Sequence, residues 1–114
     1  KKKKIAEYLK DKPNKFVCMF HSTKEFYGVH KAFEDYPFIR HQDIRSKIMW
    51  FKNLVYCGFH HGRCTIDTHD SGAKFLSQDK AKFNIYFKKE LLCLLPGDSW
   101  IAMDNKSKQY GELI

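Results

Sequence analysis

The sequence predicts an α+β domain with a central, mainly antiparallel sheet of about five strands and with helices packed on it. Three observations lead to this prediction. Short apolar runs rich in aromatic and β-branched residues alternate with amphipathic segments of helical spacing. Hydrophobic residues make up 43% of the 114 residues and aromatic residues 16%, which is enough for one compact core. No internal repeat or domain boundary interrupts the pattern, so we expect residues 1–114 to form a single domain.

The first part of the chain is expected to supply two helices and two strands. An apolar stripe over residues 4–12 indicates a short amphipathic helix, and the apolar run at residues 16–20 indicates a buried strand. The sequence STKE beginning at Ser22 is a capping box, so a second helix is expected from there through residue 34. Residues 38–39 then open a second strand.

The later part of the chain is expected to be richer in strands. Residues 44–52 fit either a helix or an extended edge strand, and both assignments stay open. The remaining elements, in order, are a strand at residues 54–59, a short helix capped by Ser71, a strand at residues 82–89, a buried strand at residues 90–95 and, after a Pro-Gly turn, a final strand at residues 99–104. The aromatic residues expected mainly in the core are Phe16, Phe26, Phe33, Trp50, Phe83 and Phe87.

The chain is strongly basic, which favours an anionic partner. It carries 21 Lys and Arg residues against 13 Asp and Glu residues, a net charge of +8. Seven lysines fall within the first fifteen residues, against only Glu7 and Asp11. Because no apolar run has the length of a membrane span and no signal peptide is apparent, we expect no membrane partner.

Two basic turns are the candidate DNA contacts. The 12–15 turn, KPNK, precedes the first expected strand, and the 60–63 turn, HHGR, follows the strand at residues 54–59. Lysines neutralise phosphates, Arg and Asn reach base edges, and Gly62 permits close approach of a phosphate backbone. Neighbouring strands lie about 5 Å apart, so we expect the two turns to form one surface. The candidate nucleic-acid-binding residues are Lys12, Asn14, Lys15, Arg40, His41, His60, His61 and Arg63.

Two further classes of site stay open at residues 57–70, CGFHHGRCTIDTHD. Its cysteines and histidines are ligand types of structural zinc, but the second, separated ligand pair of a strong zinc motif is missing. A metal-dependent nuclease would use alternating histidines on one strand, whereas the adjacent His60 and His61 would point to opposite faces. We therefore expect free cysteines, no metal and no cofactor. An ordinary solvated polar turn is the remaining interpretation.

The layout resembles the origin-binding domain of polyomavirus-type large T antigens. The resemblance rests on IAEYLKDKPNK, FVCMFHSTKEF, DYPFIRHQD, NLVYCGFHH and SGAKFLSQDKAKFNIYF. In that family, a loop before the first strand and a His/Arg-rich loop after a central strand together bind duplex DNA. The resemblance implies that the 12–15 turn is the first loop and that residues 60–63 or 68–70 are the second. The second loop of the family alternates His and Arg, whereas this chain has HHGR, and residues 42–52 have no clear counterpart.

These observations together predict a DNA-binding module and not an enzyme. The implied role is origin recognition within a viral replication initiator in the host nucleus, with duplex DNA preferred over single-stranded DNA and with self-association on the DNA. The chain lacks an initial Met, so we expect a domain excised from a larger protein. The alternatives are a protein-interaction module for an acidic partner, a zinc-stabilised domain and a metal-dependent nuclease-like domain.

Overall fold

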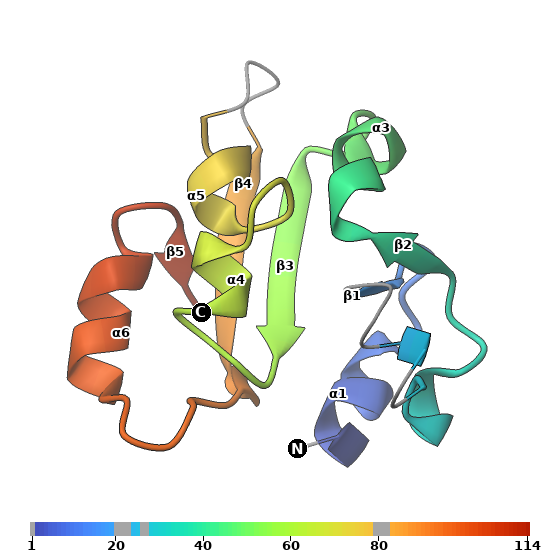
Figure 1. Ribbon diagram of the computed structural model, residues 1–114, viewed down its shortest axis with the longest axis horizontal. Helices are drawn as coiled ribbons and strands as arrows, with labels where there is room; N and C mark the ends of the chain where they lie inside the picture. Colours follow the sequence, from blue (N-terminus) through green and yellow to red (C-terminus); the bar gives the residue numbers. More distant parts are fainter. Residues whose placement is uncertain (1, 20–23, 26–27, 79–82) are drawn as a thin grey trace.

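The fold combines short helices with two small sheets (Figure 1). The structure is a computed structural model, and it describes residues 2–19, 24–25, 28–78 and 83–114. The strands are β1 (Val17–Met19), β2 (Phe38–Arg40), β3 (Asn53–Gly58), β4 (Asn84–Leu92) and β5 (Glu112–Leu113). The helices are α1 (Lys2–Leu9), η1 (Lys31–Phe33), η2 (His41–Asp43), α3 (Ile44–Ile48), α4 (Cys64–Asp67), α5 (Ala73–Leu76) and α6 (Trp100–Ser107), where η marks a 3-10 helix.

Both sheets are parallel, so the expected antiparallel sheet of about five strands is wrong, although the α+β class holds. β1 pairs with β2 in a 2-stranded sheet, and β3, β4 and β5 form a 3-stranded sheet with β4 in the centre. The physical reason lies in the connections. α4 and α5 lie between β3 and β4, and α6 lies between β4 and β5. Such long helical crossovers return the chain to the start of the sheet, whereas antiparallel neighbours are joined by short hairpins.

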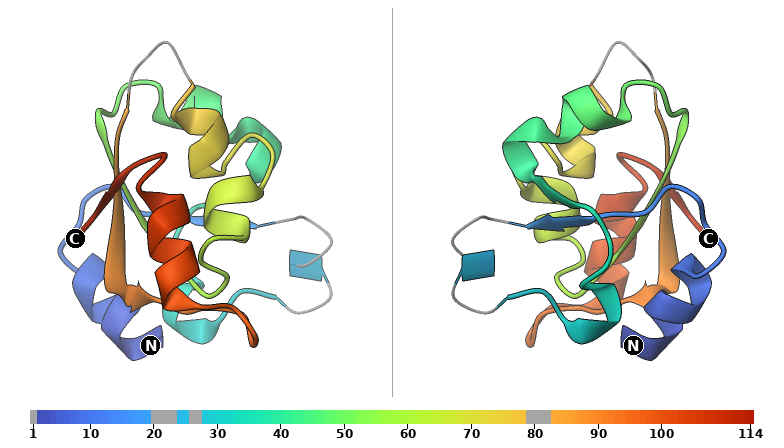
Figure 2. Two further views of the ribbon diagram at one scale, coloured as in Figure 1. Left: turned by 90° about the vertical axis from the view of Figure 1, so that its left-hand side faces the viewer. Right: turned by 90° about the vertical axis from the view of Figure 1, so that its right-hand side faces the viewer.

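The main core lies between the 3-stranded sheet and the helices that cover one side of it. Figure 2 shows α4, α5 and α6 on the same side of β4. The buried residues of this core are Ile44, Ile48, Ile66, Ala73, Leu76, Ile85, Phe87 and Leu92. A second cluster, formed by Ile5, Phe33 and Leu91, joins α1 and η1 to the carboxyl end of β4. The N-terminal helix is therefore held beside the end of the central strand.

The expected helix from Ser22 through residue 34 is not continuous. Ser22 lies outside the described residues. Gly28 has a φ of +69°, and His30 has a ψ of 140°, so an α-helix does not run through this segment. The 3-10 helix η1 forms instead, with the Nδ1 atom of His30 accepting a hydrogen bond of 3.1 Å from the Ala32 N–H. The helical spacing of the apolar residues did not reveal this break.

The C-terminal part of the chain departs from the expected strands. Residues 90–92 continue β4 and do not start a new strand. The segment expected as a final strand at residues 99–104 forms most of α6, because Ser99 is its N-cap and its Oγ accepts from the Ala102 N–H. The short helix expected at Ser71 begins later, as α5, with Gly72 as its N-cap. The open assignment of residues 44–52 resolves into α3 and a turn.

The aromatic side chains do not all lie in the core. Phe87 is fully buried and Phe33 is nearly so, as expected. Phe16 and Phe83 are half-buried against the main core, and Phe26 lies outside the described residues. Trp50 is 85% exposed, so its assignment to the core is wrong. It follows the C-terminus of α3, whose Ile44 and Ile48 take the inward positions.

Candidate nucleic-acid interface

An open hollow of basic character lies where β3 ends beside the start of α1. Its lining residues are Lys2, Lys3, His30 and Phe59, and we call it the basic hollow. The Nζ atom of Lys2 lies 6.0 Å from the centroid of the Phe59 ring. Among the described residues the lining includes no carboxylate. The hollow therefore combines ammonium groups and an imidazole around one aromatic ring.

The side chains of the basic hollow are available to a partner. Lys2, Lys3 and His30 are exposed, and Phe59 is 39% exposed. Because His30 accepts through Nδ1, its neutral ring carries the proton on Nε2 and offers a donor. The ammonium groups and this N–H suit phosphate oxygens, and the ring of Phe59 suits the apolar side of a deoxyribose. The hollow is thus chemically matched to a nucleic acid.

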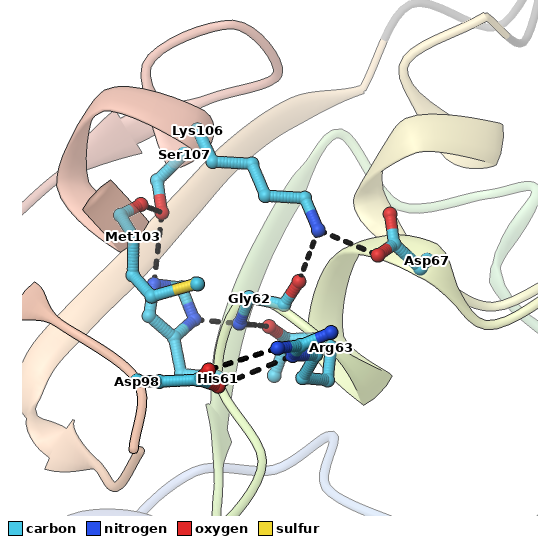
Figure 3. A network of polar contacts seen from close by, with 9 residues as sticks. His61, Gly62, Arg63, Asp67, Asp98, Met103, Lys106 and Ser107 are labelled. Carbon is cyan, nitrogen blue, oxygen red and sulfur yellow. Dashed lines mark hydrogen bonds and ion pairs between the residues drawn. The ribbon is translucent and has the colours of Figure 1, made fainter. Parts of the chain in front are cut away.

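Most residues of the neighbouring 60–63 turn bond to other parts of the same chain. His60 is exposed, and its Nδ1 lies 3.4 Å from the sulfur of Cys64. His61, in contrast, is fully buried between α4 and α6 (Figure 3). A buried imidazole has no access to phosphate. The turn therefore offers His60 to a partner but not His61 in this conformation.

Two hydroxyl groups fix the protonation of His61. The Ser107 hydroxyl donates to the Met103 carbonyl oxygen at 2.6 Å, so it accepts from the His61 Nε2–H at 2.8 Å. The Thr65 oxygen accepts from the Gly62 N–H at 3.0 Å, and its hydroxyl donates to His61 Nδ1 at 2.9 Å. Burial lowers the pKa of His61, with Asp104 opposing the shift. The geometry therefore selects the neutral Nε2–H tautomer.

Gly62 packs closely against α6, whereas the sequence suggested close contact with a phosphate backbone. Its φ is +85°, and a Cβ atom on it would overlap the sulfur of Met103. The Gly62 carbonyl oxygen accepts from Lys106 Nζ at 2.5 Å, and the same ammonium pairs with Asp67 (Figure 3). The glycine thus serves the packing of the turn on the C-terminal helix.

Arg63 is paired with a carboxylate. Its Nη2 lies 2.9 Å from Asp98 Oδ1, and its Nε donates to Asp98 Oδ2 at 3.2 Å. This bidentate hydrogen bonding raises the pKa of Arg63 and lowers that of Asp98. The Arg63 side chain is 55% exposed, but its guanidinium fork is occupied by Asp98.

The 12–15 turn lies at the other end of α1 from the basic hollow. Lys15 Nζ donates to the carbonyl oxygens of Leu9 and Lys10, which are at the C-terminus of α1. Lys12 Nζ lies 4.7 Å from the centroid of the Tyr8 ring, and Asn14 is exposed. Phe59 contacts the first turn of the same helix through Lys2. The structure therefore does not join the 12–15 and 60–63 turns into one surface as expected.

Arg40 and His41 also have partners within the chain. Arg40 Nε donates to Asp43 at 3.0 Å. His41 Nδ1 lies 2.6 Å from the Ser71 hydroxyl oxygen and 3.1 Å from the Cys18 sulfur. Burial lowers the pKa of His41 and raises that of the Cys18 thiol to about 11. The thiol of this pair is protonated at neutral pH, which does not suit a nucleophile.

The candidate metal ligands do not assemble. Within the part of the chain that the structure describes, no group of three or more His, Cys, Asp or Glu side chains is placed to hold a metal ion. Both ring nitrogens of His61 are bonded to hydroxyl groups. All four cysteines are free, and Cys64 is the exposed one.

Comparison with protein-family models, with curated proteins and with solved structures gives no match. None of the described helices is long and apolar enough to cross a membrane. The sequence did not assign Lys2, Lys3, His30 or Phe59 to the site. The N-terminal lysine run signalled charge there, whereas His30 fell in an expected helix and Phe59 at the end of an expected strand.

Proposed function

We propose that this chain is a DNA-binding module that holds duplex DNA at the basic hollow. The observation that carries the proposal is the convergence of Lys2, Lys3 and His30 around the exposed Phe59. These groups come from three separate segments, and the exposed His60 follows Phe59 directly in the sequence. Cations that neutralise phosphates supply most of the affinity of a protein for duplex DNA.

The place of this module in biology follows the sequence resemblance. In line with the resemblance to the origin-binding domains, we propose that it acts within a viral replication initiator in the host nucleus and carries no catalytic step of its own. The structure alters which residues are proposed to touch the DNA. Lys2, Lys3, His30, Phe59 and His60 replace the pair of turns as the contact surface, because His61, Arg63 and Lys15 are engaged within the chain.

The test is a binding titration of a labelled random-sequence duplex at several salt concentrations. The double variant Lys2→Ala/Lys3→Ala should weaken binding and lower the slope of log K against log salt by about 1.8, because each phosphate that the protein neutralises adds about 0.9 to that slope. The matched control is Lys74→Ala/Lys108→Ala, which removes the same charge from exposed positions on α5 and after α6. It should change the slope much less.

A second variant separates the effect of the lysine charges from the effect of the Phe59 ring. Phe59→Ala leaves the net charge at +8 and removes only the ring, so it should weaken duplex binding without changing the salt slope. Circular dichroism confirms that each variant folds. If the Lys2/Lys3 variant and its control bind the duplex alike, the basic hollow is not the DNA site and the proposal fails.

A further inference from the structure

The turn between α3 and β3 presents an aromatic side chain to solvent. Trp50 is 85% exposed, and its neighbours Met49 and Phe51 are 55% and 36% exposed. The Phe51 N–H donates to the Ile48 carbonyl oxygen at 2.9 Å, which closes the end of α3 and turns Trp50 outward. Tryptophan is enriched among the side chains that carry binding energy at interfaces, so this exposed indole is a candidate contact. Figure 1 shows α3 at the start of β3, and the α1 N-terminus lies at the other end of the strand.

The exposed charged residues next to Trp50 in the sequence are basic. Lys47 and Lys52 flank it in the sequence, and both are exposed. Residues 44–66 contain no Asp or Glu, whereas they contain Arg45, Lys47, Lys52 and Arg63. The nearest acidic residues on either side in the sequence, Asp43 and Asp67, are each paired with a cation, Arg40 and Lys106 respectively.

The shape of this surface favours an unpaired nucleotide over a lipid. Insertion into a bilayer requires a contiguous apolar face. Here the three apolar side chains are consecutive residues of one turn, and Trp50 is much more exposed than Met49 and Phe51. An exposed indole with one exposed lysine three residues before it and another two residues after it has the side-chain types that stack one base and neutralise neighbouring phosphates. Duplex bases are stacked on one another and leave no face for the ring.

We propose that Trp50, with Lys47 and Lys52, forms a stacking site for single-stranded DNA. This site is separate from the basic hollow, because β3 has six residues and spans about 20 Å between them. Substitution of Trp50 should therefore leave duplex binding at the basic hollow intact. The single-strand proposal and the duplex proposal can then fail independently of each other.

Tryptophan fluorescence reports on the stacking directly. The chain has two tryptophans, and the ring of Trp100 is partly covered by Lys89 Nζ at 4.9 Å and by His61 at 6.0 Å. Titration with an unlabelled oligo-dT single strand should quench the emission of the wild-type chain. Trp50→Phe should still bind the strand, since phenylalanine also stacks, but the quenching should disappear because only Trp100 remains. Quenching that persists in this variant overturns the proposal.

Affinity gives the second readout. Trp50→Ala should weaken binding of a labelled oligo-dT strand by about five- to 150-fold, while Trp50→Phe keeps most of the affinity. The matched control is Ile101→Ala, which removes another large side chain, 78% exposed, from α6 and should leave strand affinity unchanged. Lys47→Ala and Lys52→Ala should each lower the salt slope by about 0.7. If Trp50→Ala binds the strand as the wild type does, the single-strand site is refuted. Binding to phosphatidylserine vesicles is measured in parallel, and a loss of vesicle binding without a loss of strand binding also refutes the site.

Discussion

His61 is held neutral by its surroundings, and this has a consequence for stability at mildly acidic pH. Its pKa is lowered by burial, with Lys106 and Lys89 adding to the shift and Asp104 opposing it. Above about pH 6.5 the imidazole is neutral in both the folded and the unfolded chain. As the pH falls below that value, the unfolded chain binds a proton that the folded chain does not, so stability is lost.

The variant His61→Gln tests this linkage. At neutral pH the variant should be less stable than the wild type by about 1 to 3 kcal/mol, because a buried hydrogen-bond network is disturbed. The difference should narrow as the pH falls from about 7 to 5, by at most about 1.4 kcal/mol per pH unit. The measurement is the urea midpoint at each pH. His60→Gln is the matched control, because it makes the same change at the neighbouring, exposed histidine and should keep the two hydrogen bonds of His61.

Gly62 offers a second test at the level of one residue. Gly62→Ala introduces a Cβ at a φ of +85° and against the Met103 sulfur. Gly97→Ala is the matched control, because its φ is +89° and nothing lies within 4 Å of the new Cβ. Both variants incur the backbone cost of about 1 to 2 kcal/mol, and Gly62→Ala should incur about 1 to 3 kcal/mol more from overpacking. Equal unfolding free energies for the two variants would falsify the packing of the 60–63 turn on α6.

The sequence could not separate the roles of the residues in HHGR. Adjacent histidines look alike in a sequence, yet His60 is exposed and His61 is fully buried. The distinction depends on Ser107, which lies far along the chain and whose hydroxyl group accepts from His61. Trp50 was misplaced for a similar reason, because its aromatic character suggests burial while the end of α3 turns it outward.

At the scale of an element, α6 is attached to the rest of the fold through Ser107. This residue is fully buried, and its hydroxyl group bonds both His61 and the Met103 carbonyl. Ser107→Ala leaves the buried His61 N–H without its acceptor, so the variant should lose about 1 to 3 kcal/mol of unfolding free energy. Ser99→Ala, at the N-cap of the same helix, should lose about 1 kcal/mol.

A double-mutant cycle distinguishes the contact between α6 and His61 from the intrinsic stability of the helix. Ser107→Ala combined with His61→Gln should show a coupling energy of about 0.5 kcal/mol or more, whereas Ser99→Ala with His61→Gln should be additive. Additivity in both cycles would contradict the assigned contact. Chemical denaturation followed by circular dichroism supplies each free energy.

Elements defined by local signals were predicted well, and elements defined by context were not. β3 lies within one residue of the expected strand, because an apolar run with polar ends is a local pattern. The helix α1 follows from its apolar stripe. In contrast, the Pro-Gly pair before α6 was interpreted as a hairpin turn, although Ser99 also has the character of an N-cap. The Pro-Gly pair fits a turn before a strand and Ser99 fits the start of a helix, so local sequence could not decide between strand and helix.

At the scale of the whole molecule, the two sheets should differ in stability. β4 lies in the centre of the larger sheet and carries Ile85, Phe87 and Leu92 of the main core. β1 has three residues, all half-buried, in a 2-stranded sheet. Hydrogen exchange followed by mass spectrometry should therefore show β4 amides exchanging only by global unfolding, and β1 amides exchanging by a less costly local opening. Equal protection of both strands would argue against this division.

Strand pairing is the property that the sequence predicted least. The alternation of apolar and polar residues indicates that a strand is half-buried, but it does not identify the neighbouring strand or its direction. The candidate site depends on the same information, since His30 and Phe59 meet Lys2 only through the tertiary fold. Charge could therefore be predicted from the sequence, and the position of that charge on the surface could not.

The all-parallel pairing also bears on how quickly the chain reaches its fold. Asn53 pairs with Asn84, Tyr86 with Glu112 and Val17 with Phe38, so each strand pair closes a loop of more than twenty residues. None of these three described pairs can zip together from a local hairpin, and the entropy of loop closure is lost before their ladders form. Folding is therefore expected in milliseconds to seconds, with β4 joining only after the helices between the strands have collapsed onto it.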